Sequence, residues 1–181
     1  MRYLLDTNVF DYINKNPESL SVFINIEDAE YFYTDIQLEK EFIGISPRKY
    51  DANCDLVKQP TDEDYNRGEQ FKVIANQLNA TIVPRYANFM KNHLKADGSA
   101  YLLPESGAQY EMVMKIKSLR PNKRKKAPFS QEYDAMIAAS AIRNDCIFIT
   151  NDQDLYCAVK EYFPDKVIYL EDLLKKKYDL N

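Results

Sequence analysis

The sequence predicts an α/β fold, in which a parallel β-sheet is flanked by helices and a helical insertion lies in the middle of the chain. Short apolar segments alternate with longer segments whose apolar residues recur at helical spacing, which is the pattern of a parallel sheet with crossover helices. Between about residues 46 and 128 the alternation stops, and the chain becomes polar and helical in pattern. At 181 residues the chain suits one domain, residues 1–181, that needs no disulfides to stabilise its core.

The sheet and the helices can be placed along the chain from these patterns. Apolar segments of strand length are expected to form the sheet, and they are Tyr3–Leu5, Tyr31–Thr34, Cys146–Thr150 and Val167–Leu170. Amphipathic segments are expected to form the helices, and they are Gln37–Ile45, Asp62–Leu78, Tyr86–Leu94, Ser106–Leu119, Gln131–Arg143, Gln153–Tyr162 and Asp172–Tyr178. Ser130 is suited to cap the helix that follows it, because serine side chains accept hydrogen bonds from free helix amides.

The cysteine and histidine content bounds the chemistry and the compartment. Cys54, Cys146 and Cys157 show no CxxC spacing, and His93 is the only histidine, which argues against a zinc cluster or a disulfide framework. No signal-peptide pattern opens the sequence, and no apolar run approaches the roughly 18 residues that span a bilayer. We therefore expect a cytoplasmic protein without a membrane partner.

The charge is unevenly distributed. The formal net charge is −4, which by itself argues against a polyanionic partner. Residues 115–126, KIKSLRPNKRKK, nevertheless carry seven Lys or Arg residues and no acid. Such a run can contact phosphates or be a solvated loop, and the sequence leaves both interpretations open.

Acidic residues follow the predicted strands. Asp6 comes directly after the first strand, and Asp152 lies just beyond the third. If these strands are parallel neighbours, both carboxylates emerge at one edge of the sheet, where open α/β sheets bind ligands. Asp134 shares a helix face with Ala138 and Ala141, whose small side chains would let that helix approach the same edge.

A middle acid is expected from the segment QLEKEFIGI. It offers Glu39 and Glu41 beside a hydrophobic stripe formed by Leu38 and Phe42. We favour Glu41, because it adjoins that stripe, although the spacing leaves Glu39 open. Each acid also has an ordinary interpretation: Asp6 and Asp152 can serve as helix caps, and the two glutamates as solvated helix charges.

Several carboxylates at one edge would repel one another unless a cation balanced their charges. An all-oxygen set of ligands favours Mg²⁺ or Mn²⁺ over zinc or copper, and these ions also bind substrate phosphates. The chemistry indicated is metal-assisted attack of water on a phosphodiester. A phosphatase of the haloacid-dehalogenase type is less favoured, because such enzymes need a second Asp where this chain has Asn8.

Three segments resemble the successive acidic motifs of PIN-domain ribonucleases, the family that includes the VapC-type toxins of toxin–antitoxin pairs: LLDTNVF, TDIQLEKEF and YDAMIAASAIRNDCIFITNDQDL. The resemblance implies a parallel sheet flanked by helices and an acidic cluster that holds Mg²⁺ or Mn²⁺. The middle Glu falls out of register with the family by about one residue, and the insertion is longer than in compact toxins. Residues implied at the site are the acids Asp6, Asp134 and Asp152, with Glu41 favoured over Glu39 as the middle acid, the further metal ligand Asp154, and the supporting polar residues Asn8 and Thr150.

The resemblance also implies a substrate and partners. The expected activity is endoribonucleolytic cleavage of RNA. The partners that the resemblance suggests are an antitoxin protein and a second copy of the chain. In that case the basic run would contact RNA phosphates through Arg120, Lys123, Arg124, Lys125 and Lys126. The alternative is a non-cleaving PIN-like module that binds RNA or protein.

Overall fold

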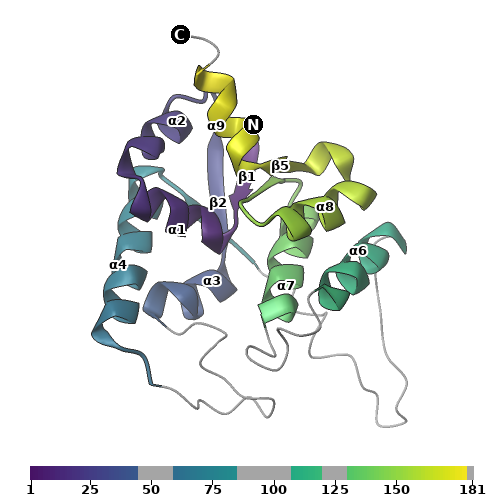
Figure 1. The fold of residues 1–181 in the computed structure, drawn as a ribbon, viewed down its shortest axis with the longest axis horizontal. Coiled ribbons are helices and arrows are strands. Elements are labelled where there is room, and N and C mark those ends of the chain that lie inside the picture. Colours follow the sequence, from purple (N-terminus) through teal and green to yellow (C-terminus); the bar gives the residue numbers. More distant parts are fainter. Residues whose placement is uncertain (45–58, 85–106, 120–129, 179–181) are drawn as a thin grey trace.

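The computed structural model describes residues 1–44, 59–84, 107–119 and 130–178. Its centre is a sheet of five parallel strands in the order β3-β2-β1-β4-β5 (Figure 1). The strands are β1 (Arg2–Leu5), β2 (Glu30–Thr34), β3 (Thr81–Val83), β4 (Ile147–Thr150) and β5 (Val167–Tyr169). The helices are α1 (Thr7–Lys15), α2 (Leu20–Ile24), α3 (Asp35–Glu39), α4 (Asp62–Gln77), α6 (Gly107–Ser118), α7 (Ser130–Arg143), α8 (Gln153–Tyr162) and α9 (Leu170–Tyr178), with short 3-10 helices η1 (Pro17–Ser19), η2 (Glu41–Ile43) and η4 (Pro164–Lys166). The predicted fold class, a parallel sheet flanked by helices, is confirmed.

The order of the strands determines where a ligand site can form. From β1 the chain adds β2 and β3 on one side, and it later adds β4 and β5 on the other side. The order therefore reverses between β1 and β4, which pair in parallel with Leu5 opposite Ile149. Open α/β sheets bind ligands in the crevice at the carboxyl ends of the strands at such a reversal.

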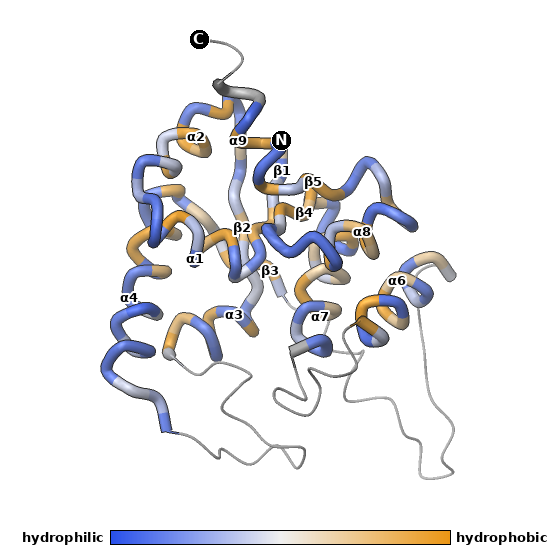
Figure 2. Tube along the Cα trace, viewed as in Figure 1, coloured by the Kyte–Doolittle hydropathy of each residue, from blue (hydrophilic) through white to orange (hydrophobic). Residues whose placement is uncertain are grey.

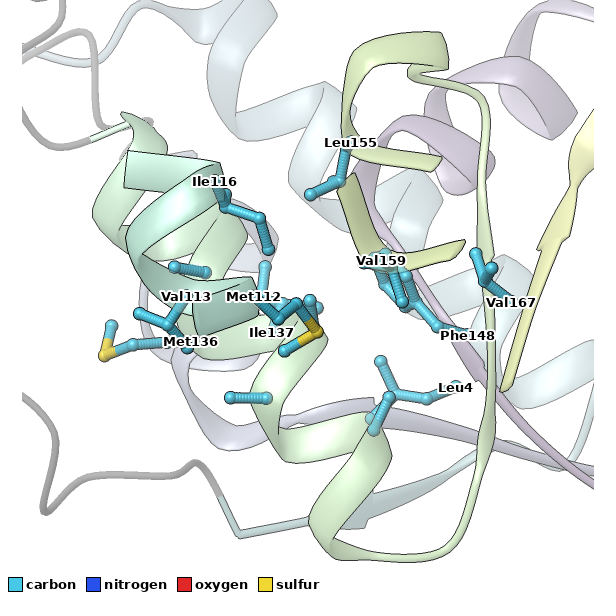
Figure 3. Packing of buried hydrophobic residues seen from close by; sticks show 14 of the residues in the cluster. Leu4, Met112, Val113, Ile116, Met136, Ile137, Phe148, Leu155, Val159 and Val167 are labelled. Carbon is cyan, nitrogen blue, oxygen red and sulfur yellow. The ribbon is translucent and has the colours of Figure 1, made fainter. Parts of the chain in front are cut away.

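Two hydrophobic cores cover the two faces of the sheet, because side chains alternate along a strand. In β1, Leu4 belongs to one core, whereas Tyr3 and Leu5 belong to the other. Figure 3 shows Leu4 grouped with Phe148 of β4 and with side chains of α6, α7 and α8. Residues of α1, α2, α4 and α9 fill the second core. In Figure 2, hydrophobic and hydrophilic residues alternate along α1 and α4, as expected for helices with one buried face.

The segment 59–84, inside the predicted insertion, contributes to the second core and to the central sheet. Phe71, Ile74 and Ala75 of α4 are buried in the second core, and β3 pairs in parallel with β2. No strand is predicted at β3, because this short segment lies within the part of the sequence that is polar and helical in pattern. The predicted helix Tyr86–Leu94 lies outside the described residues. No helix in the described ranges is long and apolar enough to cross a membrane.

The predicted helix Gln37–Ile45 is wrong in its start and its continuity. Helix α3 starts earlier, at Asp35, and ends at Glu39, because Lys40 leaves the helical region with φ −121° and ψ −70°. The chain then forms η2 and turns at Gly44, whose φ of +81° is readily adopted only by glycine. Helices α1 and α2 are absent from the prediction, although Val9, Phe10 and Ile13 of α1 have helical spacing.

Replacing Gly68 by Ala is expected to lower the free energy of unfolding by roughly 1–3 kcal/mol. A Cβ atom on Gly68 would lie 2.5 Å from the carbonyl oxygen of Phe42 and 2.8 Å from its carbonyl carbon, so α4 would have to move away from η2. Urea denaturation measures the change. Gln70→Ala, at an exposed position of the same helix, is the control and should change stability by less than about 0.5 kcal/mol. A Gly68→Ala protein with the same free energy of unfolding as wild type would contradict this close packing.

Candidate active site

Asp6 lies at the reversal of strand order, between the end of β1 and the start of α1. Its backbone N–H donates to Ile149 O at 2.9 Å, which continues the β1–β4 pairing. Its side chain caps α1, since Oδ1 accepts a hydrogen bond from Thr7 N at 2.8 Å. The residue is only 3% exposed. The capping interpretation of Asp6 is therefore confirmed, yet the cap occupies only one carboxylate oxygen.

The second oxygen of Asp6 belongs to a network of polar side chains. Asp6 Oδ2 accepts hydrogen bonds from Asn8 Nδ2 at 2.6 Å and from the Thr150 hydroxyl at 2.7 Å. Asn8 Nδ2 also lies 3.2 Å from Thr150 Oγ1, and Asn8 Oδ1 accepts from Asn151 N at 2.7 Å. Asn8 and Thr150, both predicted as supporting polar residues, thus lock the carboxylate of Asp6 between β1 and β4.

Asp152 follows β4 at the same edge of the sheet. Its Oδ1 caps α8 by accepting from Asp154 N at 3.0 Å and Leu155 N at 3.2 Å. Its backbone N–H donates to Thr150 Oγ1 at 3.1 Å. One threonine hydroxyl therefore links the carboxylate of Asp6 to the backbone of Asp152, and two predicted acids are held together at one edge of the sheet.

The electrostatics of Asp6 reflect this arrangement. The pKa of Asp6 is raised from 3.8 to about 6, and burial is the largest cause, because the ionised carboxylate loses hydration. The negative charge of Asp152 also acts to raise the pKa. Hydrogen bonds from Thr150, Thr7 and Asn8 act in the opposite direction, since they stabilise the ionised form. The balance is a buried carboxylate that ionises near neutral pH and has a second acid as neighbour.

The other predicted acids lie on three different helices. Asp134 is half-buried in the second turn of α7, where Ala138 and Ala141 are buried as the expected face requires. Asp154 is exposed in the first turn of α8. Glu39 is the last residue of α3. Their membership in one metal site stays a prediction.

Glu41, the predicted middle acid, is paired with Arg67 of α4. Arg67 Nη1 lies 3.5 Å from Glu41 Oε2, and the same guanidinium donates to both carboxylate oxygens of Asp11, at 2.7 and 2.6 Å. The guanidinium also lies 4.8 Å from the centre of the Phe71 ring. These contacts join η2, α4 and α1, so Glu41 has a structural partner, and its role at the metal site stays a prediction.

The pair Arg67–Asp11 is expected to show a coupling energy of about 1 kcal/mol in a double-mutant cycle of Arg67→Gln and Asp11→Asn. Both side chains are about 30% exposed and their contact is bidentate, so we expect a larger coupling energy than for a typical surface ion pair. Urea denaturation of the four proteins measures the coupling. Additive destabilisation would show that the pair contributes no joint stability.

The sequence matches the family described as PIN domain over residues 3–161. The chain belongs to the PIN domain family. Comparison with the curated proteins found no match. Among solved structures, the chain is similar to VapBC2 from Rickettsia felis bound to a DNA fragment from their promoter. The two are 16% identical, with a TM-score of 0.48, and the alignment covers 93% of this chain and 98% of that chain.

The donor set of this PIN domain fits a hard divalent cation. Three of about four acceptor positions on the Asp6 carboxylate are taken by hydrogen bonds, which leaves one on Oδ1. Mg²⁺ commonly binds through one or two carboxylates and completes its shell with water and phosphate oxygens. Asp6 and Asp152 offer two carboxylates of this kind, and their binding of one cation stays a prediction. Across residues 1–44, 59–84, 107–119 and 130–178, no three His, Cys, Asp or Glu side chains form a ready metal cage.

Some predicted and some unpredicted residues remain to be placed. The predicted RNA contacts Arg120 and Lys123–Lys126 lie outside the described residues. Arg67 and Asp11 were not predicted, because their contact depends on how α4 packs against α1. Gln37 was predicted only as the start of a helix, although its spacing from Thr34 is that of a capping box.

Proposed function

We propose that this PIN domain is a Mg²⁺- or Mn²⁺-dependent endoribonuclease that hydrolyses RNA phosphodiester bonds at the carboxyl ends of β1 and β4. The observation that carries the proposal is the buried carboxylate of Asp6, which three donors orient beside the second acid, Asp152. A structural cap would need only the bond from Thr7. The additional bonds from Asn8 and Thr150 favour a carboxylate held for a ligand.

The residues have distinct roles in this proposal. Asp6 and Asp152 bind the cation, and Asp134, Asp154 and Glu41 are further candidates for its shell or for orienting water. A bound Mg²⁺ or Mn²⁺ would supply Lewis acidity to the attacking water and the scissile phosphate. Asn8 and Thr150, grouped in the same network, keep the Asp6 carboxylate from rotating, so that little reorganisation is needed during the reaction.

The basic run is proposed to bind the RNA backbone. Replacing Lys123, Arg124, Lys125 and Lys126 by Gln is expected to weaken RNA binding uniformly across sequences and to flatten its salt dependence. Each lost phosphate contact removes counterion release, which changes the slope of log affinity against log salt by roughly 0.7 for a single strand. Fluorescence anisotropy at several salt concentrations measures the slope. An unchanged slope would identify the run as a solvated loop.

Cleavage of labelled RNA by the purified protein tests the proposed activity. We expect cleavage with Mn²⁺ or Mg²⁺ and none with EDTA. The second candidate function, a non-cleaving module, rests on the capping roles of Asp6 and Asp152, which by themselves give both acids a structural purpose. RNA binding without metal-dependent cleavage would favour that candidate.

An antitoxin partner and a homodimer are also proposed, on the ground that the PIN-domain resemblance extends to VapC-type toxins. A small adjacent reading frame with a DNA-binding head and a disordered tail would support the toxin role. Inhibition of cleavage by its purified product would test the partnership directly. Failure of that product to bind the chain would contradict it.

A further inference from the structure

The strands β1 and β2 separate where the candidate site begins. Glu30 N donates to Met1 O at 2.8 Å, and the register places Tyr3 opposite Tyr31. In a parallel ladder the same pattern repeats every two residues, so the next members are Phe32 N with Tyr3 O and then Thr34 N with Leu5 O. The hydrogen bond from Thr34 N to Leu5 O is not formed, since the pairing of the two strands ends at Leu4 and Phe32.

The side-chain amide of Gln37 occupies the gap between Thr34 N and Leu5 O. Thr34 N donates to Gln37 Oε1 at 2.8 Å, and Gln37 Nε2 donates to Leu5 O at 2.9 Å. The amide therefore bridges the two strands as an inserted peptide group would. Gln37 of α3 thus connects the two strands at the point where their direct pairing ends.

Gln37 uses its full hydrogen-bonding capacity in this place. Its Oε1 also accepts from the Thr34 hydroxyl at 3.0 Å, and its Nε2 also lies 3.3 Å from Thr7 Oγ1. Four bonds saturate a side-chain amide, and the residue is 1% exposed. A capping box alone requires only the bond to the N-cap N–H, so the two bonds made by Nε2 are additional.

The two groups that Nε2 contacts are on the residues before and after Asp6. We propose that Gln37 is a positioning residue that holds the backbone carbonyl before Asp6 and the threonine hydroxyl after it, which sets the direction of the Asp6 carboxylate for the cation. This inference rests on the proposed role of Asp6. On the β4 side Asp6 is held by its own N–H, and on the β2 side by Gln37.

Gln37→Met tests the proposal, since methionine has a similar shape and makes none of the four bonds. Calorimetric titration with Mn²⁺ below the melting temperature should give a dissociation constant roughly 10- to 100-fold higher than that of wild type, the range for residues that orient metal ligands. Gln109→Met is the matched control. Gln109 is 3% exposed and donates to Ala139 O on α7, so its loss should lower the melting temperature without changing Mn²⁺ affinity.

Thr34→Ala separates capping from bridging, because it removes the capping hydroxyl but leaves the bonds from Thr34 N and to Leu5 O. It should destabilise the protein and leave Mn²⁺ affinity unchanged. Wild-type affinity in Gln37→Met, or an equal loss in Gln109→Met, would overturn the proposal.

Amide hydrogen exchange provides a readout that does not depend on metal. In Gln37→Met the amides of Asp6 and Thr34 should exchange faster, and Gln109→Met should leave both unchanged. If wild type binds no Mn²⁺, the proposed function fails, and the exchange data alone decide the role of Gln37. Unchanged exchange at Asp6 in Gln37→Met would overturn it.

Discussion

Asp6→Asn is expected to reduce metal-dependent RNA cleavage by a factor on the order of 10²–10³, the range seen when one preorganised electrostatic group is removed from an active site. The carboxylate supplies a negative charge to the cation, and an amide of the same shape does not. The substitution keeps an N-cap at the start of α1, because Asn caps helices about as well as Asp. The fold should therefore persist.

Steady-state cleavage of labelled RNA with Mn²⁺ measures the loss, and circular dichroism checks the fold. Asp165→Asn is the control. Asp165 is exposed in η4, just before the first residue of β5, whereas the candidate site lies at the carboxyl ends of the strands. It should retain full activity. Wild-type rates in folded Asp6→Asn would show that the catalytic site does not lie at the carboxyl ends of β1 and β4.

The second large effect concerns the metal-free protein. Because the pKa of Asp6 is raised from 3.8 to about 6, the folded state binds its proton more tightly than the unfolded state does. The resulting stability is fully present below pH 3.8 and is lost as pH rises through about 6. A shift of about two pKa units corresponds to about 3 kcal/mol. The metal-free protein should thus lose up to that amount between pH 4 and pH 7 through this group.

Asp6→Asn isolates this contribution, because the other titrating groups are common to both proteins. The difference in unfolding free energy between wild type and Asp6→Asn should change by about 2.4 kcal/mol between pH 4 and pH 7, in favour of the variant at the higher pH. Mn²⁺ at 100 times its dissociation constant should then stabilise wild type by about 2.7 kcal/mol and the variant by less. Urea denaturation with chelator measures the pH-dependent difference, and urea denaturation with Mn²⁺ measures the stabilisation by the metal. A difference in unfolding free energy that does not change with pH would contradict a raised pKa for the buried carboxylate of Asp6.

Much of this geometry was predictable from the sequence. An apolar strand that ends in Asp6 and another that is followed by Asp152 place two carboxylates at one edge once the strands are parallel neighbours. The structure shows that β1 and β4 are such neighbours. The capping and site interpretations of Asp6 do not exclude each other, because one oxygen of Asp6 caps α1 while the other belongs to the polar network.

The rest depended on contacts that no local pattern encodes. The bridge formed by Gln37 exists because β1 and β2 separate after Leu4 and Phe32, and strand separation has no signal in the sequence. The pairing of Glu41 with Arg67 depends on the close approach of α4 to η2, which a glycine at position 68 permits. The break at Lys40 changes the direction of Glu41 relative to a continuous helix.

Paramagnetic broadening by Mn²⁺ tests the central claim most directly, because it locates the bound ion without requiring catalysis. In an amide NMR spectrum of the folded protein, substoichiometric Mn²⁺ should first broaden the signals of Asp6, Asn8, Asn151 and Asp152, and in Asp6→Asn the same signals should broaden only at higher Mn²⁺ concentration. Broadening that begins elsewhere, at Asp11 and Glu41 for example, or that is the same in wild type and Asp6→Asn, would contradict a metal site between β1 and β4.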